Sequence, residues 1–385
     1  MRILIGGDYA PTSFTEKDFW LGNAEKLYSA ALLQYLASFD FRIFDFECCF
    51  DGAGSPIRKY GPILTAPVAC MEGILPVQPS LMVLANNHSA NLGSEGLEHT
   101  IAVFAEHGIP CVGAGTPQQA AQPHFLEKDG IRVGIYACAE HEFTYATEAR
   151  EGVNGYDPLR TFDEIRNIKE ECDALIVFYH GGILDWRYPA PAEQKALRKM
   201  VDCGADLVVG QHTHCIGCQE VYWGKTILYG QGDFLFARPT RNDLRYSGLL
   251  LEAEVTERGV EVSYRVRVKP RDTIRLADPA EEKVILREFA SRSEELQEEG
   301  ALAGRFREYV SRRATQNIDT LSGRNVLYRA YNKATRHKAM EKWFLGNYGR
   351  GGLLRLINFL ECETHRETLL EYLKQLAGIP DDQPF

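Results

Sequence analysis

The chain has 385 residues, and its 43 basic and 53 acidic side chains give a formal net charge of −10. A hydrophobic content of 45% and a charged content of 25% are typical of a globular protein with a sizeable core. The acidic balance argues against a broad nucleic-acid or anionic-membrane surface, and no apolar run approaches the roughly 18 residues of a membrane span. The N-terminal apolar run is too short for a signal peptide, so we expect a cytoplasmic protein whose ten cysteines are reduced thiols.

The first third of the chain alternates strand patterns with helical patterns. In order, the predicted elements are a strand over residues 2–6, a helix over 25–39, a strand over 41–46, a strand over 81–85 and a helix over 94–107. A glycine- and proline-rich stretch over residues 51–67 is long enough to be a functional loop rather than a short connection.

The middle of the chain adds two hairpins to this alternation. Alternating runs on both sides of Asp129-Gly130 predict a hairpin over residues 125–138, and a similar pattern predicts a second one over 249–268. Between them we expect a helix opened by a capping box at Thr161 to Glu164, strands over 174–179, 207–209 and 226–229, and a helix over 192–203. Strands, helices and interleaved hairpins together favour a layered α/β sandwich with mixed sheets.

Charged helical patterns replace the strand signals from about residue 278 onward. We therefore place a domain boundary near residue 275, with an α/β domain over 1–275 and an added helical region over 276–385. Helices are expected over residues 281–292, 302–313, 328–344 and 353–376. The many arginines and lysines of this region are interpreted as a solvated helical face, with an anion-binding patch as the alternative.

Polar side chains directly follow most of the predicted strands. These residues are Asp8, Asp45, Glu47, Asn87, His88, His180, His212 and His214. In α/β sheets the carboxyl ends of the strands border one crevice, so these groups can converge there. Carboxylates and imidazoles without thiolates suit Mn, Fe, Zn or Mg, and two neighbouring ions need a shared carboxylate. The pattern predicts a centre for two divalent metal ions.

The spacing of His212 and His214 fits this centre. A lone His-x-His is ordinarily a turn with one exposed imidazole, but alternate residues of extended backbone point to the same side. Beside the other strand ends, His212 with His180 could complete one ion and His214 with Asn87 the other. Glu47 or Asp8 could bridge the two ions.

Several of these motifs resemble the bacterial capsule-synthesis family CapA (PgsA), which is named for poly-γ-glutamate capsule formation. The similar segments are Ala85-Asn86-Asn87-His88, His180-Gly181-Gly182, Gly210-Gln211-His212-Thr213-His214 and Tyr229-Gly230-Gln231-Gly232-Asp233-Phe234. They stand in the family's order over most of residues 1–240. The family is similar to calcineurin-like metallophosphoesterases, which implies a four-layer α/β/β/α sandwich and a two-metal centre.

The resemblance also implies roles for single residues. The positions that match metal ligands of the family are Asp8, Asn87, His180, His212 and His214, and His88 matches the residue that protonates a leaving group. We expect Asp45, Asn86 and Asp233 to support the ligands or to contact substrate. The chain departs from the pattern at Ala10, where metallophosphoesterases have a histidine, and at Asp45 and Asp233, where the capsule family usually has asparagine. The number of bound ions and the role of Asp45, as a ligand or as a support, therefore stay open.

The leading hypothesis is a metal-dependent, phosphoesterase-like hydrolase of a small molecule or an anionic polymer, linked to poly-γ-glutamate or capsule-type polymer metabolism. The alternative is a component of polymer synthesis that binds such a polymer in the same cleft without hydrolysing it. A γ-glutamyl amide hydrolase lies between the two, and a vestigial cleft is the structural alternative. No nucleic-acid partner and no membrane span are expected, and the sequence does not indicate an oligomeric state.

Overall fold

The computed structural model describes residues 1–59, 61–237, 243–269 and 273–310, with scattered positions between 331 and 378. The chain divides into two compact units, one over residues 1–299 and one over 300–381. In the second unit residues 301–310 are helical, whereas the helices expected over 328–344 and 353–376 lie largely outside the described residues. None of the helices in the described part of the chain combines the length and apolarity that a membrane span requires.

The first sheet has the order β18-β17-β16-β1-β2-β5-β6, and β15 also pairs with β1. β1 is parallel to β2 and β15 and antiparallel to β16, so the sheet is mixed. Its strands are β1 (Arg2–Ala10), β2 (Phe41–Phe46), β5 (Leu81–Val83), β6 (Cys111–Val112), β15 (Asp233–Phe236), β16 (Ser247–Thr256), β17 (Gly259–Val268) and β18 (Arg275–Leu276). The expected hairpin over residues 249–268 is the β16–β17 pair.

The second sheet has the order β13-β14-β12-β11-β9-β8. Its four central strands are parallel, and β8 and β13 are antiparallel strands at the two edges. The strands are β8 (His124–Lys128), β9 (Ile131–Ala139), β11 (Ala174–His180), β12 (Leu207–Gln211), β13 (Ile216–Tyr222) and β14 (Lys225–Gln231). The expected hairpin over residues 125–138 is the β8–β9 pair, and β9 continues inward as a neighbour of β11.

Successive side chains of a strand point to opposite faces of the first sheet, so the buried residues form two separate hydrophobic cores. In β1, Ile3 and Ile5 face the second sheet, while Leu4 faces the helices on the other side, as the period of two requires. Strands that are buried on both faces carry apolar side chains throughout, as Ala174 to Tyr179 do. The core between the sheets is aliphatic, with Ile43, Ile176 and Val209 among its members.

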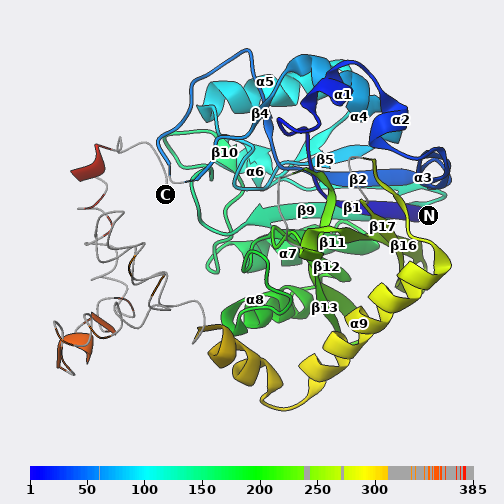
Figure 1. Cartoon of the computed structure of the whole chain (residues 1–385). Helices are drawn as coiled ribbons and strands as arrows, with labels where there is room; N and C mark the ends of the chain where they lie inside the picture. Colours follow the sequence, from blue (N-terminus) through cyan, green and yellow to red (C-terminus); the bar gives the residue numbers. More distant parts are fainter. Residues whose placement is uncertain are drawn as a thin grey trace. The chain divides into compact units, whose positions relative to one another are not determined.

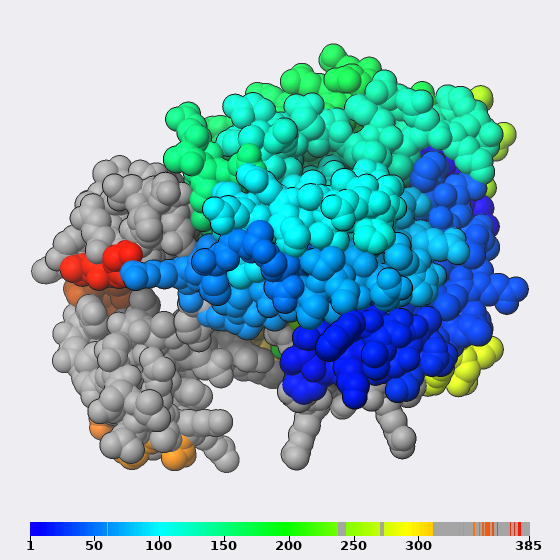
Figure 2. All heavy atoms as spheres, turned by 90° about the horizontal axis from the view of Figure 1, so that it is seen from above, coloured from blue at the N-terminus to red at the C-terminus, as the bar shows by residue number. Residues whose placement is uncertain are grey.

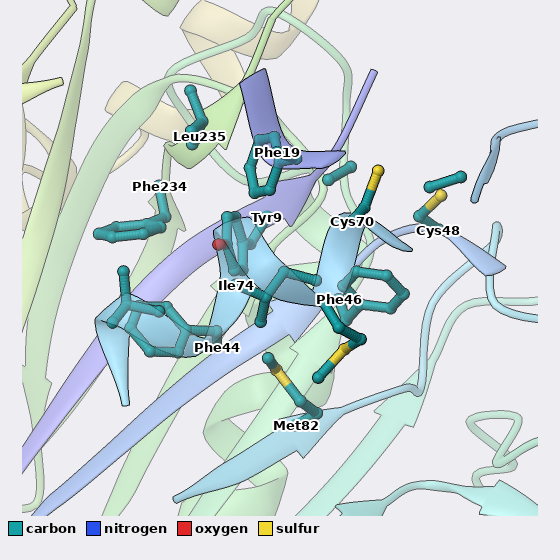
Figure 3. Packing of buried hydrophobic residues seen from close by; sticks show 14 of the residues in the cluster. Tyr9, Phe19, Phe44, Phe46, Cys48, Cys70, Ile74, Met82, Phe234 and Leu235 are labelled. Atoms are coloured by element: carbon teal, nitrogen blue, oxygen red, sulfur yellow. The ribbon is translucent and has the colours of Figure 1, made fainter. Parts of the chain in front are cut away.

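The core on the outer face of the first sheet is aromatic instead (Figure 3). The rings of Tyr9, Phe44 and Phe234 pack with centroids 4.7 to 5.6 Å apart. Such tilted and edge-on contacts contribute about 0.5–1.5 kcal/mol per pair beyond burial. These ring contacts hold β1, β2 and β15 together close to the residues of the candidate site.

Helices cover the outer faces of both sheets (Figure 1). α3 (Ala30–Leu36) and α5 (Gly93–Glu106) lie over the first sheet, and α7 (Thr161–Lys169) and α8 (Pro191–Asp202) lie over the second. Figure 2 looks onto the first helical layer, where residues of the first third of the chain, dark blue to cyan, form the surface. This order of layers confirms the expected four-layer α/β/β/α sandwich.

Shorter elements and one further helix complete the first unit. α9 (Pro279–Gln297) begins at a capping box of Asp278 and Glu281 and contacts β13 and β17. The short helices are α1 (Glu16–Trp20), α2 (Ala24–Leu27), α4 (Met71–Ile74) and α6 (Pro117–Ala120), with 3-10 turns at Val68–Cys70, Leu75–Val77 and Asp243–Arg245. The short strand pairs are β3 (Cys49–Phe50) with β4 (Thr65–Ala66) and β7 (Ala114–Gly115) with β10 (Gly152–Val153).

Two local predictions are wrong. The single helix expected over residues 25–39 is broken at Tyr28, whose extended backbone forms a β-bridge with Ile274. Its hydroxyl bonds the Tyr9 hydroxyl at 2.5 Å and donates to the Gly73 carbonyl at 2.8 Å. The capping box expected at Thr161 does not form, because Thr161 is already the first helical residue and Arg160 is the N-cap. The Thr161 hydroxyl accepts from the Asp157 amide at 3.0 Å instead.

The chain passes from one sheet to the other within a single residue. β14 of the second sheet ends at Gln231, and β15 of the first sheet begins at Asp233. Gly232 between them has φ +77°, a left-handed conformation that glycine adopts without strain. The Gln231 side chain donates to the Ile5 carbonyl at 2.6 Å and so joins the two sheets at this point.

Candidate metal centre

The carboxyl ends of β1 and β2 lie beside the start of β15 in the first sheet. Asp8 of β1 is in register with Asp45 of β2 and with Asp233 of β15. All three carboxylates are at most 2% exposed. Burying three carboxylates together is costly unless cations or hydrogen bonds compensate them.

The second sheet contributes imidazoles to the same place. His180 is the last residue of β11, and His212 and His214 follow the end of β12. The turn is strained, because His212 has φ +90° and His214 has φ +54°, values that residues other than glycine rarely adopt. The His212 amide points at the Asp8 carboxylate, 3.3 and 3.4 Å from its two oxygens. Strained backbone of this kind persists only where the surrounding contacts hold it in place, as they do at functional sites.

Glu47 lies at the middle of the cluster and is fully buried. Among the residues that the structure describes, neither of its carboxylate oxygens has a hydrogen-bond partner. The Nε2 atoms of His88, His180 and His214 lie 3.8, 4.0 and 3.8 Å from these oxygens. Such separations are too long for hydrogen bonds, but two ligands that share one ion at about 2.1 Å each are roughly 3 to 4 Å apart.

One group of potential ligands surrounds Glu47 Oε1. His180 Nε2 lies 3.1 Å from His212 Nδ1 and 3.2 Å from Asn87 Oδ1. Ligand atoms of Glu47, His180 and His212 all lie within 4.8 Å of one another. Two imidazole nitrogens, an amide oxygen and a carboxylate oxygen are a donor set for a divalent transition metal.

A second group lies on the other side of Glu47. His214 Nδ1 is 2.7 Å from Asp233 Oδ1 and 3.0 Å from Asp8 Oδ2, and its Nε2 faces Glu47 Oε2. Atoms of Asp8, His214 and Asp233 also lie within 4.8 Å of one another. Glu47 therefore has one oxygen toward each group, as a carboxylate shared by two ions would.

The pKa values in the cluster show how strongly it attracts positive charge. Burial, together with the charges of Asp8 and Asp45, raises the pKa of Glu47 to about 8. Burial alone would lower the pKa of His180 and of His214, but the surrounding carboxylates raise them to about 9 and about 10. Burial and the neighbouring imidazoles of His180, His214 and His88 keep the pKa of His212 well below its usual value, so its imidazole is neutral.

Hydrogen bonds fix the orientation of the imidazoles. His180 Nδ1 lies 2.7 Å from Asp45 Oδ2, which accepts a hydrogen bond from the imidazole N–H. This bond directs the other ring nitrogen, Nε2, toward Glu47 and Asn87. Asn86 in turn donates to Asp45 Oδ1 at 2.7 Å. A carboxylate behind an imidazole fixes its tautomer and raises its basicity as a ligand.

His88 belongs to the same cluster but differs in its contacts. Its Nδ1 lies 2.8 Å from Asn91 Oδ1, an acceptor, so Nε2 is the nitrogen that faces Glu47. The backbone amide of His88 donates to Asn86 Oδ1 at 3.0 Å, which holds the turn after β5. The imidazole is 4% exposed and thus lies just inside the protein surface.

The structure brings together every residue that the sequence assigned to the site. They are Asp8, Asp45, Glu47, Asn86, Asn87, His88, His180, His212, His214 and Asp233. The roles assigned to them stay proposals. Ala10, at the position where metallophosphoesterases have a histidine, ends β1 and has no ligand atom to offer.

Sequence reasoning missed several residues that touch the cluster, among them Asn91, which contacts His88. Glu140 follows the end of β9, with one oxygen 3.8 Å from His212 Nε2, and Glu142 accepts from Asn87 Nδ2 at 2.7 Å. Lys59 lies 3.3 Å from the Asn87 carbonyl, and the fully buried Arg267 donates to the Asp233 carbonyl at 2.5 Å. The sequence could have indicated Glu140, because it directly follows the strand β9, much as other site residues follow theirs.

The sequence matches one protein-family model and several curated proteins. The model of the family described as "Bacterial capsule synthesis protein PGA_cap" matches residues 2–238, which is more than half of the chain. "PGA biosynthesis protein CapA" of Bacillus subtilis (strain 168) is 30% identical over 156 residues, which cover 40% of this chain and 41% of that protein. A "Probable polyglutamine synthesis accessory protein" of Mycobacterium tuberculosis is 33% identical over 172 residues, which cover 41% and 45% of the two chains. The chain thus spans less than half the length of these relatives.

Solved structures with a similar arrangement are more distant. A hypothetical protein from Thermus thermophilus has a TM-score of 0.45 and 16% identity over 70% of this chain and 100% of that one. A phosphatase from Mycoplasma pneumoniae has a TM-score of 0.44 and 13% identity over 74% of this chain and 96% of that one.

Proposed function

The chain belongs to the bacterial capsule synthesis protein family PGA_cap, and on that premise we propose that it is a hydrolase that depends on two divalent metal ions. Its substrate would be a phosphoester or a γ-glutamyl amide of a capsule-type anionic polymer, or a small molecule of the same chemistry. The ions would be Mn, Fe, Zn or Mg, the metals that such an oxygen and nitrogen donor set accepts.

The observation that carries the proposal is the Glu47 carboxylate. A buried carboxylate with no hydrogen bond to either oxygen costs several kcal/mol unless a cation compensates it. Four buried carboxylates, those of Asp8, Asp45, Glu47 and Asp233, carry a formal charge of −4 when ionised. The buried Arg267 guanidinium offsets one of these charges, and the remaining −3 exceeds what one divalent cation balances, which supports two ions rather than one.

Each ion would have its own set of ligands. Asn87, His180 and His212 would hold one ion and Asp8 and His214 the other, with Glu47 shared between them. Asn87 is thus grouped with His180 and not with His214, as the sequence suggested, because its Oδ1 lies 3.2 Å from His180 Nε2. Since Ala10 offers no ligand, the second ion has few protein ligands and hence room for water or substrate. When bound, such ions supply Lewis acidity and a water of lowered pKa at neutral pH.

The residues of the chain would then position the substrate and move protons. Asp45 and Asp233 hold the His180 and His214 imidazoles through their Nδ1 atoms, so that Nε2 is the nitrogen turned inward. His88, with Nδ1 on Asn91 and Nε2 toward Glu47, is placed to protonate the leaving group.

A component that binds polymer without hydrolysing it is the second candidate, favoured by the relatives named for polyglutamate or polyglutamine synthesis. The carboxylates of Glu140 and Glu142 beside His212 and Asn87 weigh against it, because they repel a polyanion in the absence of metal. Binding of poly-γ-glutamate at two salt concentrations separates the candidates. Tight, salt-dependent binding without turnover would favour the second.

Metal content tests the first candidate most directly. The purified chain, loaded with Mn²⁺ or Zn²⁺ and desalted, should carry two ions, and Glu47→Gln, which keeps the shape but removes the charge, should lose them. His212→Ala should lose at least the ion beside His180 and Asn87. A chain that takes up no divalent metal under any loading condition overturns the proposal. A screen of phosphoesters and γ-glutamyl peptides with the loaded chain then identifies the substrate class.

A further inference from the structure

The side-chain amide of Asn87 has a defined orientation. Its Nδ2 donates to Glu142 Oε2 at 2.7 Å, and its Oδ1 lies 3.2 Å from His180 Nε2. An ionised carboxylate only accepts hydrogen bonds, so Glu142 selects the NH₂ end of the amide. The oxygen end is thereby turned toward the centre, where a cation needs it.

The segment that carries Glu142 is fastened to the same turn by a second bond. The buried Thr144 hydroxyl donates to the Asn86 carbonyl at 2.9 Å. The two contacts, at Glu142 and Thr144, bind residues 142–144 to the backbone and side chain of the turn after β5. Glu142 is thus held in place independently of its bond to Asn87.

Lys59 approaches the turn from the other side. It comes from the loop over residues 51–67, and its ammonium lies 3.3 Å from the Asn87 carbonyl and 3.5 Å from His88 Nδ1. The ammonium also lies 5.2 Å from the centroid of the Phe143 ring, within the range of a cation–π contact. Lys59 therefore connects the loop over 51–67, the segment that carries Glu142, and the Asn87-His88 peptide.

We propose that Glu142 is a positioning residue that sets the Asn87 amide for one of the two ions, and that Lys59 holds the Asn87-His88 peptide in the matching place. This inference rests on the proposed two-metal function. Neither residue needs to touch metal or substrate, because Glu142 acts through Asn87, and Lys59 acts through the backbone carbonyl.

The test is a titration of the metal-free full chain with Mn²⁺, read as the number of ions bound and the affinity of each. Removing a hydrogen-bond partner behind a metal ligand typically costs 10–100-fold in metal affinity. Glu142→Ala should lower the affinity for one ion by about that factor and leave the affinity for the other ion unchanged. Glu142→Gln should restore most of the affinity, since the Gln carbonyl oxygen can still accept from Asn87 Nδ2.

Lys59→Met should weaken the binding of the same ion as Glu142→Ala does. The double variant should lose less binding free energy for that ion than the two single variants lose together. Glu127→Ala, at an exposed acid on β8, is the matched control and should bind as the wild type does. Thermal unfolding of the metal-free variants accompanies each titration. Equal weakening of both ions together with a lower unfolding midpoint would indicate a merely structural role and overturn the inference.

The two proposals fail in different ways. If the wild type binds no ion, the two-metal function and this inference fall together. If the wild type binds two ions and Glu142→Ala binds both with unchanged affinity, only the positioning role of Glu142 is overturned.

Discussion

Asp45 and His180 lie 135 positions apart in the chain and meet through a 2.7 Å contact between Oδ2 and Nδ1. Asp45 is the last residue but one of β2 in the first sheet and His180 is the last residue of β11 in the second, so this contact joins the two sheets at the candidate centre. The orientation of the His180 imidazole therefore depends on how the sheets are packed.

Asp45→Ala should release the His180 imidazole and lower the affinity for the ion on its side by about 10–100-fold. The remaining ligands stay in place, so the loss should be smaller than that of His180→Ala. Metal titration followed by calorimetry measures both. Asp51→Ala, at an exposed acid nearby, is the control and should leave both affinities unchanged. Unchanged affinity in Asp45→Ala would mean that the contact does not orient the ligand.

His88→Ala should keep both ions and lose turnover by about 10²–10⁴-fold, because a proton donor and not a ligand has been removed. Metal content and the rate of substrate hydrolysis are measured on the same preparation. His107→Ala, at the C-terminal end of α5, is the matched histidine control. Loss of an ion in His88→Ala would instead assign His88 as a ligand.

Glu193 predicts a pH dependence of stability outside the metal cluster. Burial raises the pKa of this carboxyl from 4.5 to about 8. Between these values the folded state retains a proton that the unfolded state has lost, so the free energy of unfolding falls as pH rises. At about 1.4 kcal/mol per pKa unit, the fall amounts to a few kcal/mol at most.

Glu193→Gln should remove this dependence, and the variant should be more stable than the wild type above pH 8 and equally stable near pH 4.5. The Gln carbonyl can still accept the bond from the Ala190 amide, which is 3.0 Å from the Glu193 carboxylate. Urea unfolding of the metal-free chain at several pH values gives the slope. An identical slope in both proteins would show that Glu193 ionises normally in the folded state.

Gly7→Ala should damage both stability and metal binding. A Cβ at Gly7 would lie 1.7 Å from the Gly232 carbonyl oxygen, so β1 and the crossover to β15 would have to separate. We expect a loss of more than about 3 kcal/mol in the free energy of unfolding. Weaker ion binding should accompany it, since Asp8 and Asp233 adjoin these glycines. Gly304→Ala is the control and should bind metal normally, because no described atom outside its own stretch of helix lies within 4 Å of the added Cβ.

The strand ends of the site could be predicted because the signal is local. An apolar run followed at once by Asp8, Glu47, His180 or His212 is visible without any knowledge of pairing. The layered architecture followed from the alternation of elements, and the four-layer order from the resemblance to a known family. The structure adds which ends adjoin, as the register of Asp8 with Asp45 and Asp233 shows.

The residues that were missed depend on contacts between distant parts of the chain. Glu142 and Lys59 stand in loops without a periodic pattern, and only their approach to Asn87 gives them a role. Arg267 occurs in a strand that reads as part of an ordinary hairpin. The break at Tyr28 was invisible for the same reason, because its extended backbone forms a β-bridge with Ile274, far along the chain.

The β16–β17 hairpin lies beyond residue 238, where the match to the family ends, yet the centre depends on it. β16 pairs with β1 along Arg2 to Ile5, and Arg267 of β17 holds the Asp233 carbonyl. A fragment cut at residue 238 would expose the edge of β1 to pairing with other chains and leave that carbonyl without its partner. We therefore expect the smallest piece of this chain that folds and holds the proposed ions to extend at least to Val268, beyond the limits of the family match.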